Sequence, residues 1–176
     1  MGIDLDILLK CRVKLRNNTM IGDKGQMIRE IIHVGITVSN IERSIEFYKN
    51  VLGLKFCGQM VMEGESTDKL FGIDNCKVKV AYLNGSDKVN CPPVELIEFA
   101  NHNFKENNSC LDRISISEIC FKVSDIEDTY EKLKKLNVEF ISEPQYFDLR
   151  NQGFGVSKAV YFKDIDGNIL ELIQAF

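Results

Sequence analysis

Two stretches of the chain share one pattern of apolar and polar positions. Residues 38–42 read Val-Ser-Asn-Ile-Glu, and residues 123–127 read Val-Ser-Asp-Ile-Glu. Each copy follows a short apolar run and opens a segment with the apolar spacing of a helix that buries one face. The apolar positions are Ile41, Ile45, Tyr48 and Leu52 in the first segment and Ile126, Tyr130, Leu133 and Leu136 in the second. The pattern predicts an internal repeat with one amphipathic helix in each copy.

Short apolar segments predict four strands in each copy, one before the helix and three after it. They lie near residues 31–38, 54–62, 77–83 and 94–99, and near residues 115–123, 138–142, 158–163 and 168–174. Ser39 and Ser124, each three residues before a glutamate, are expected to cap the two helices. The sequence therefore predicts an α+β fold of two tandem βαβββ modules, whose strands form a curved mixed sheet around a cleft.

The repeat also sets the expected division of the chain. Residues 31–100 form the first module, the polar residues 101–113 a linker, and residues 114–176 the second module, all within one domain of residues 31–176. Residues 1–30 lie outside both copies. Every odd position from Ile3 to Leu15 is apolar, and this alternation predicts an extra strand at the edge of a sheet.

Composition narrows the class of protein. Hydrophobic residues make up 44% and the formal net charge is -4, which favours a folded protein and disfavours binding to nucleic acid. No apolar run approaches the ~18 residues that span a membrane, and acidic residues stand where a signal peptide needs basic ones. None of the six cysteines forms a C-x-x-C pair. These features predict a cytoplasmic protein with reduced thiols and no membrane partner.

Strand alternation selects one candidate site. In residues 32–38 the even positions are large and apolar, so His33 faces away from the helix, and the same argument applies to Glu95, Glu118 and Glu171. The repeat makes Glu118 the counterpart of His33, and Glu171 the counterpart of Glu95. Three carboxylates that converge in a cleft repel one another and lose solvation. A divalent cation relieves both costs, so we expect these four residues to bind one.

Four sequence motifs resemble a known superfamily: His-Val-Gly-Ile-Thr-Val (33–38), Glu-Phe-Tyr-Lys-Asn-Val-Leu-Gly-Leu (46–54), Val-Glu-Leu-Ile-Glu (94–98) and Asp-Ile-Asp-Gly-Asn-Ile-Leu-Glu-Leu-Ile (164–173). They are similar to the vicinal oxygen chelate superfamily, which includes glyoxalase I, methylmalonyl-CoA epimerase, bleomycin resistance proteins and extradiol dioxygenases. The resemblance implies metal ligands on the first and last strands of each module, at His33, Glu95, Glu118 and Glu171.

One position departs from the family pattern. Glyoxalase-like members usually carry histidine where this chain has Glu118. One histidine and three carboxylates make a harder ligand set, which suits manganese, magnesium or ferrous iron better than zinc or nickel. The identity of the single divalent ion is therefore left open among these metals.

The resemblance implies two classes of function for a homodimer with a small-molecule substrate. The first is a glyoxalase-like lyase or isomerase, or an acyl-thioester epimerase, that works through a metal-chelated enediolate. In such an enzyme Glu171 matches the catalytic base and Glu95 is its counterpart. The alternative is a metal-free binding protein of the bleomycin-resistance type, with its cleft lined by aromatic residues. These would be Tyr82, Phe99, Tyr146, Phe147 and Phe154.

The extension before the repeat gives a first prediction. A shortened chain that begins at Met27 retains both copies of the repeat. We expect it to keep the circular dichroism spectrum of the full chain and nearly all of its thermal stability. An insoluble or molten product would mean instead that the missing strand belongs to the core or to a dimer interface.

Overall fold

The computed structural model of the chain describes residues 31–85, 93–101, 109–112, 114, 116–153 and 155–176. Its strands are β1 (Val34–Thr37), β2 (Lys55–Glu63), β3 (Lys77–Asn84), β4 (Val94–Phe99), β5 (Ile119–Lys122), β6 (Gln145–Asp148), β7 (Val156–Lys163) and β8 (Ile169–Ala175). Its helical elements are α2 (Ile41–Glu46), the π-helical turn η1 (Phe47–Val51), α3 (Glu65–Phe71), α4 (Ile126–Lys135) and the 3-10 turn η2 (Arg150–Gln152).

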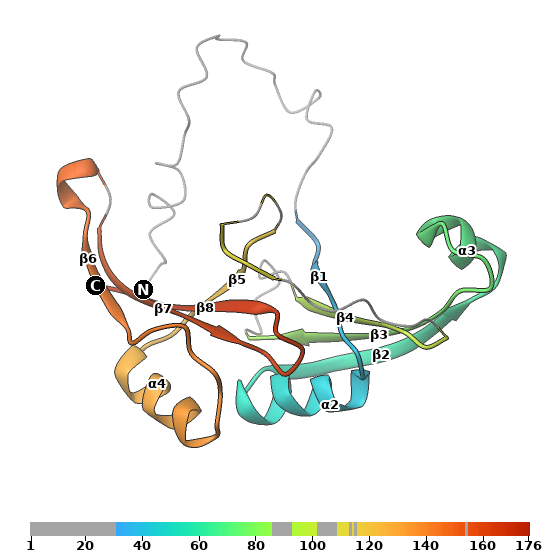
Figure 1. Cartoon of the computed structure of the whole chain (residues 1–176), viewed down its shortest axis with the longest axis horizontal. Coiled ribbons are helices and arrows are strands. Elements are labelled where there is room, and N and C mark those ends of the chain that lie inside the picture. Colours follow the sequence, from blue (N-terminus) through green and yellow to red (C-terminus); the bar gives the residue numbers. More distant parts are fainter. Residues whose placement is uncertain (1–30, 86–92, 102–108, 113, 115, 154) are drawn as a thin grey trace, which may run out of the picture.

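The strands form two four-stranded sheets of identical topology. Their orders are β1-β4-β3-β2 and β5-β8-β7-β6, so the first strand of each module pairs with its last. These two pairings are parallel, and the remaining ones are antiparallel. The two mixed sheets lie next to each other in Figure 1. The predicted α+β architecture of two βαβββ modules is confirmed.

One hydrophobic core joins the modules. Helices α2 and α4 both lie below the sheets in Figure 1. Ile41, Tyr48 and Leu96 of the first module belong to the same buried cluster as Ile126 and Phe162 of the second, and each is at most 2% exposed. At about 1.5–3 kcal/mol for each large apolar side chain, this shared burial makes the two modules one folding unit.

A side chain from the last strand of each module binds the N-terminus of that module's helix, α2 or α4. Glu98 of β4 accepts a hydrogen bond from the Ile41 backbone N–H at 2.6 Å, and Gln174 of β8 accepts one from the Ile126 N–H at 2.9 Å. The caps are Asn40 and Asp125, whose side chains accept from the amides three residues later. The expected serine caps were thus one residue early.

The second module differs from the prediction in its second strand. Residues 138–142 contribute only an isolated bridge, Phe140 to Phe162, and the strand β6 begins after Pro144. Both pieces pair with β7, but the pairing shifts between them. Proline has no backbone N–H to donate, so the ladder is interrupted there. The counterpart β2 has no proline and runs unbroken in sequence for nine residues.

Helix α3 was not predicted from the sequence. It lies at the far end of the first sheet, between β2 and β3 (Figure 1). Phe71 of α3 packs edge-to-face on Phe99 of β4, with ring centroids 5.3 Å apart, and this contact covers the buried side chains of Val78 and Val80. Its short length and mainly polar sequence, Glu-Ser-Thr-Asp-Lys-Leu-Phe, explain why periodicity gave no signal.

The predicted N-terminal strand and most of the predicted linker fall outside the described residues. The boundaries of the extension, modules and linker therefore stay predictions. Among the described residues, no helix is long and apolar enough to cross a membrane.

The turn between β7 and β8 ties the modules together. The buried Tyr48 hydroxyl donates a hydrogen bond to Asp164 at 2.8 Å, and burial together with this carboxylate raises the pKa of Tyr48 well above its usual value. The hydroxyl therefore stays protonated and remains a donor. Asp166 accepts hydrogen bonds from the backbone N–H and the hydroxyl of Ser39, which explains why Ser39 is not a helix cap.

This tie gives a second prediction. Tyr48→Phe removes the donor to a buried carboxylate and should lower the free energy of unfolding by about 1–3 kcal/mol. Chemical denaturation followed by circular dichroism measures the loss. Tyr146→Phe is the matched control, because Tyr146 is 59% exposed, and it should change stability by less than about 0.5 kcal/mol. Equal effects of the two substitutions would contradict a role for the Tyr48–Asp164 bond.

Candidate functional site

The parallel strand pairs position the candidate residues. Gly35 of β1 stands opposite Glu95 of β4, and Cys120 of β5 stands opposite Glu171 of β8. The neighbours of Glu95 in the strand, Val94 and Leu96, are buried in the shared core with the helices. Because side chains alternate along a strand, Glu95 points to the other side of the sheet, which we call the open face. The same alternation puts Glu171 on the open face of the second sheet.

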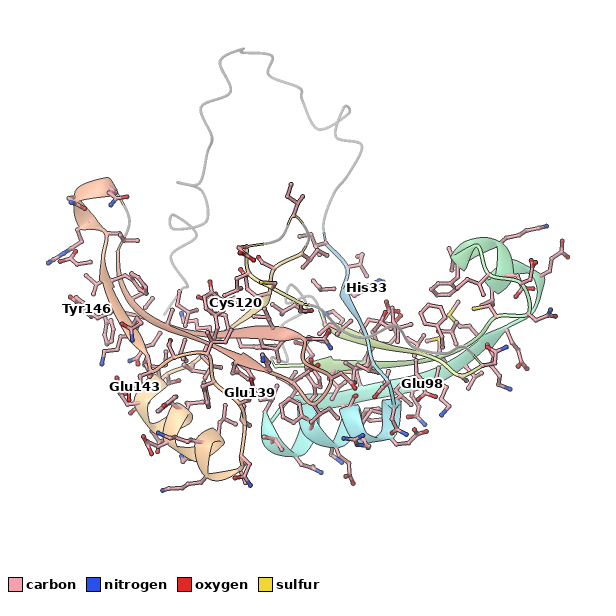
Figure 2. The ribbon with its side chains drawn as sticks, in the orientation of Figure 1. His33, Glu98, Cys120, Glu139, Glu143 and Tyr146 are labelled. Carbon is pink, nitrogen blue, oxygen red and sulfur yellow. The ribbon has the colours of Figure 1, made fainter. Side chains whose placement is uncertain are left out.

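Three side chains form the first half-site, which we define as His33, Tyr82 and Glu95. The His33 Nε2 atom lies 3.0 Å from Oε2 of Glu95. The Tyr82 hydroxyl donates a hydrogen bond of 2.6 Å to the other carboxylate oxygen, Oε1. Only 12% of the Glu95 side chain is exposed, against 41% for His33. Figure 2 shows His33 at the start of β1, with Glu98 labelled nearer α2.

The electrostatics of the first half-site keep Tyr82 a donor. The hydrogen bond to Glu95, together with partial burial, raises the pKa of Tyr82 to about 12. The hydroxyl is therefore protonated throughout the neutral range, and both oxygens of the Glu95 carboxylate have a neighbour.

Four side chains form the second half-site, which we define as Glu118, Cys120, Tyr161 and Glu171. Cys120 stands opposite Glu171 in the β5–β8 pair, and desolvation together with this neighbouring carboxylate raises the pKa of the thiol. Tyr161 of β7 stands opposite Glu171, as Tyr82 stands opposite Glu95. Burial first, and then the charges of Glu171 and Glu118, raise the pKa of Tyr161. The carboxylates of Glu118 and Glu171 therefore both lie close to the protonated Cys120 thiol and Tyr161 hydroxyl.

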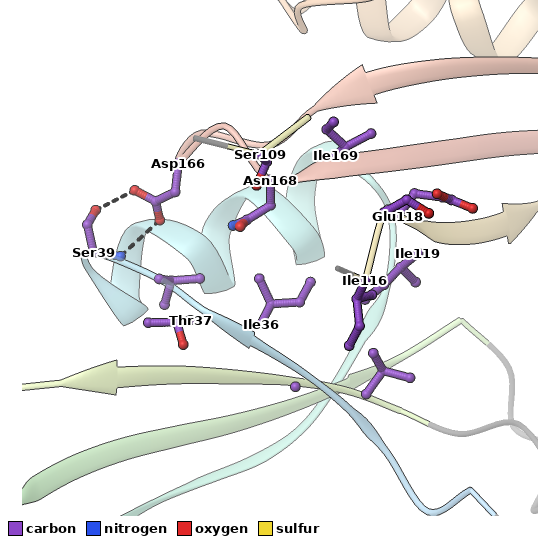
Figure 3. A pocket seen from close by; sticks show the side chains of 14 residues that line it. Ile36, Thr37, Ser39, Ser109, Ile116, Glu118, Ile119, Asp166, Asn168 and Ile169 are labelled. Atoms are coloured by element: carbon purple, nitrogen blue, oxygen red, sulfur yellow. Dashed lines mark hydrogen bonds between the residues drawn. The ribbon is translucent and has the colours of Figure 1, made fainter. Parts of the chain in front are cut away.

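A cavity of about 450 Å³ lies where the modules meet (Figure 3). One wall is β1, and the opposite wall comes from the chain before β5 and the turn before β8. Gly35 and Glu118 both line it, so Glu118 faces the first module. The dashed bonds in Figure 3 are those between Ser39 and Asp166, which close one end of this junction cavity.

His33 and Glu95 are in direct contact, with Nε2 3.0 Å from Oε2. Adjacent ligand atoms of an octahedral divalent ion, each about 2.1 Å from it, lie about 3 Å apart, so the same spacing fits two ligands of one ion. Nitrogen and carboxylate oxygen donors fit the chemistry of such an ion.

The structure does not assemble all four predicted ligands in one cluster. Within the part of the chain that is described, no three His, Cys, Asp or Glu side chains are grouped so as to hold a metal ion. His33 and Glu95 meet on the first sheet, whereas Glu118 and Glu171 belong to the second. The four-residue metal site therefore stays a prediction. The structure places two of its residues in each module.

Three side chains of the half-sites are not among the predicted metal ligands: Tyr82, Cys120 and Tyr161. The sequence predicts Tyr82 as a lining residue of a binding cleft and Cys120 as a reduced thiol, and it does not single out Tyr161. Strand alternation around Tyr82, between the core residues Ala81 and Leu83, already placed its side chain on the open face. The register that brings it to Glu95 depends on β3–β4 pairing, which alternation alone does not specify.

Comparison with known proteins agrees with this architecture. Residues 30–172 match the family model of the Glyoxalase/Bleomycin resistance protein/Dioxygenase superfamily. The chain is 32% identical over 148 residues to the metallothiol transferase FosB of Staphylococcus epidermidis, which covers 83% of this chain and 84% of the relative. A metallothiol transferase FosB of Staphylococcus haemolyticus is 31% identical over the same length.

Solved structures show the same fold. A glyoxalase family protein from Bacillus cereus superposes with a TM-score of 0.74 at 19% identity, covering 86% of this chain and 97% of that one. The trypanothione-dependent glyoxalase I of Leishmania major superposes with a TM-score of 0.57 at 21% identity, covering 84% and 87% of the two chains. The sequence and the fold together place this chain in the glyoxalase/bleomycin resistance protein/dioxygenase superfamily.

Proposed function

We propose that this protein is a divalent-metal-dependent enzyme that transfers a thiol to a small, oxygen-bearing substrate. The observation that carries the proposal is the pair of half-sites, with His33 3.0 Å from Glu95 on one sheet and two further carboxylates beside a thiol on the other. The 32% identity to a metallothiol transferase supports the thiol as one reactant.

A second copy of the chain would complete each site. His33 and Glu95 of one copy would then face Glu118 and Glu171 of the other, and the homodimer would hold two such sites. Among the described residues, no three of these side chains group together within one chain, and a site shared by two copies would bring all four to one ion. The partial exposure of His33, at 41% of its side chain, leaves its imidazole accessible to a partner.

The residues have distinct roles in the proposed reaction. His33, Glu95, Glu118 and Glu171 would hold the ion, which supplies Lewis-acid polarisation of a substrate oxygen when it is bound. Glu171 is the proposed proton acceptor, because it lies on the open face opposite the Cys120 thiol and matches the base position implied by the resemblance. It would take the proton of the incoming thiol, and Glu95 is its counterpart in the first module.

Two other functions are compatible with the same residues. A glyoxalase-like lyase or isomerase, or an acyl-thioester epimerase, would use Glu171 or Glu95 to remove a proton from carbon. The placement of both carboxylates on the open face favours this as the second candidate. A metal-free binding protein would need neither the His33–Glu95 geometry nor the second pair of carboxylates, and a metal titration separates it from the enzymes.

The third prediction tests the ion. Manganese at about a hundredfold excess over its dissociation constant should raise the melting temperature by about 5–10 °C. The rise should shrink at pH 5, because protons compete with the ion for its ligand atoms. Glu118→His should shift the preference toward zinc or nickel, because imidazole is the softer ligand. Thermal unfolding with a panel of divalent ions measures both effects.

The control for the third prediction is Glu131→His, at an exposed position on α4. It introduces the same side chain and should leave the metal preference of the wild type unchanged. If no divalent ion stabilises the wild-type protein and none is found in it by elemental analysis, the metal-dependent enzyme is wrong and the binding protein replaces it.

A further inference from the structure

The carboxylates Glu95 and Glu171 stand opposite the first strands of their modules but have different neighbours there. In the first module, the hydroxyl of Tyr82 on β3 donates a hydrogen bond to Glu95 at 2.6 Å. In the second, Cys120 on β5 stands opposite Glu171. The residue that occupies the position of Cys120 in the first module is Gly35, which has no side chain. Glu95 therefore has a hydrogen-bond donor on β3 and an open position on β1.

Gly35 leaves one oxygen of Glu95 accessible. A Cβ atom at this position would lie 3.5 Å from Oε2 of Glu95 and 3.2 Å from Cδ1 of Ile97. The space beside Oε2 is thus open on the β1 side, where His33 approaches to 3.0 Å. Oε1 has no such freedom, because the Tyr82 hydroxyl occupies it. A carboxylate fixed in this way presents one oxygen to a ligand, whereas a free one could present either or both.

The Tyr82 ring is itself fixed. It packs on the buried cluster of Cys76, Val78 and Val80 on the open face of the first sheet. Its ring centroid also lies 6.0 Å from that of His33, with the planes tilted by 57°. Packing therefore fixes the position of the hydroxyl. A hydrogen bond to a charged carboxylate is also shorter and stronger than one between two neutral groups.

We propose that Tyr82 is a positioning residue that holds Glu95 as a single-oxygen metal ligand, with Oε2 directed at the ion that His33 also binds. This inference rests on the proposed function, because it assigns Tyr82 to the metal site proposed above. Residues that orient a metal ligand without touching the metal commonly contribute 10–100-fold to metal affinity. Tyr82 would do so from β3, the third strand in the order of the first sheet, and it lies outside the four sequence motifs of the superfamily.

The test measures Mn²⁺ affinity of the full-length protein by electron paramagnetic resonance of the free ion. Tyr82→Phe keeps the ring and its packing and removes only the hydroxyl, so it should raise the dissociation constant for Mn²⁺ about tenfold or more. Without metal, its melting temperature should fall by only a few degrees for the lost hydrogen bond, and its circular dichroism spectrum should match that of the wild type. Tyr130→Phe, on α4 and in the core on the helix side of the sheets, makes the same chemical change away from both half-sites and should alter the dissociation constant less than twofold.

A double-mutant cycle shows whether Tyr82 acts through Glu95. In a Glu95→Ala protein the hydroxyl has no carboxylate to hold, so adding Tyr82→Phe should leave Mn²⁺ affinity within about twofold. A crystal structure of metal-free Tyr82→Phe gives a readout that needs no ion, and it should show the Glu95 carboxylate rotated away from its contact with His33.

The outcomes separate this inference from the proposed function. Manganese binding by the wild type with unchanged affinity in Tyr82→Phe, or an intact His33–Glu95 contact in the variant crystal, would overturn the positioning role and leave the metal enzyme standing. A wild-type protein that binds no divalent ion would overturn both.

Discussion

The parallel pairing of the first and last strands in each module is the constraint on which the site depends. It sets Gly35 beside Glu95 and Cys120 beside Glu171, and the alternation of side chains then sends both carboxylates to the face away from the helices. A parallel neighbour can be reached only by a crossover, and the helix of each module supplies it. The packing of α2 and α4 in the core therefore helps to fix the positions of Glu95 and Glu171.

Placing carboxylates on a partly covered sheet has an electrostatic cost, and the chain offsets it with donors. Glu95 has the Tyr82 hydroxyl on one oxygen and the His33 imidazole 3.0 Å from the other, and the Cys120 thiol stands opposite Glu171. The pKa values of Tyr82 and Cys120 are both raised, so the hydroxyl and the thiol stay protonated at neutral pH. A divalent ion would offset the same cost more completely, which is the physical link between these arrangements and the metal chemistry of the superfamily.

Local periodicity was enough to predict the two modules, their helices and the orientation of His33, Glu95 and Glu171, because each of these follows from alternation within one segment. Features that depend on a distant partner were missed. Ser39 binds Asp166 in the other module, so Asn40 caps the helix instead. Pro144 separates the bridge at Phe140 from β6, so the strand predicted at 138–142 does not form as one segment. The register that joins Tyr82 to Glu95 is set by strand pairing. The placement of Glu118 and Glu171 relative to the first half-site likewise depends on contacts beyond one segment.

The central claim is that the two half-sites meet on one divalent ion. An anomalous-scattering map from crystals grown with manganese tests it most directly. The account predicts one ion in each site, with His33, Glu95, Glu118 and Glu171 all contributing ligand atoms at about 2.0–2.2 Å, the last two coming from a second copy of the chain. Manganese that is absent from the map, or held by residues of neither half-site, would contradict it.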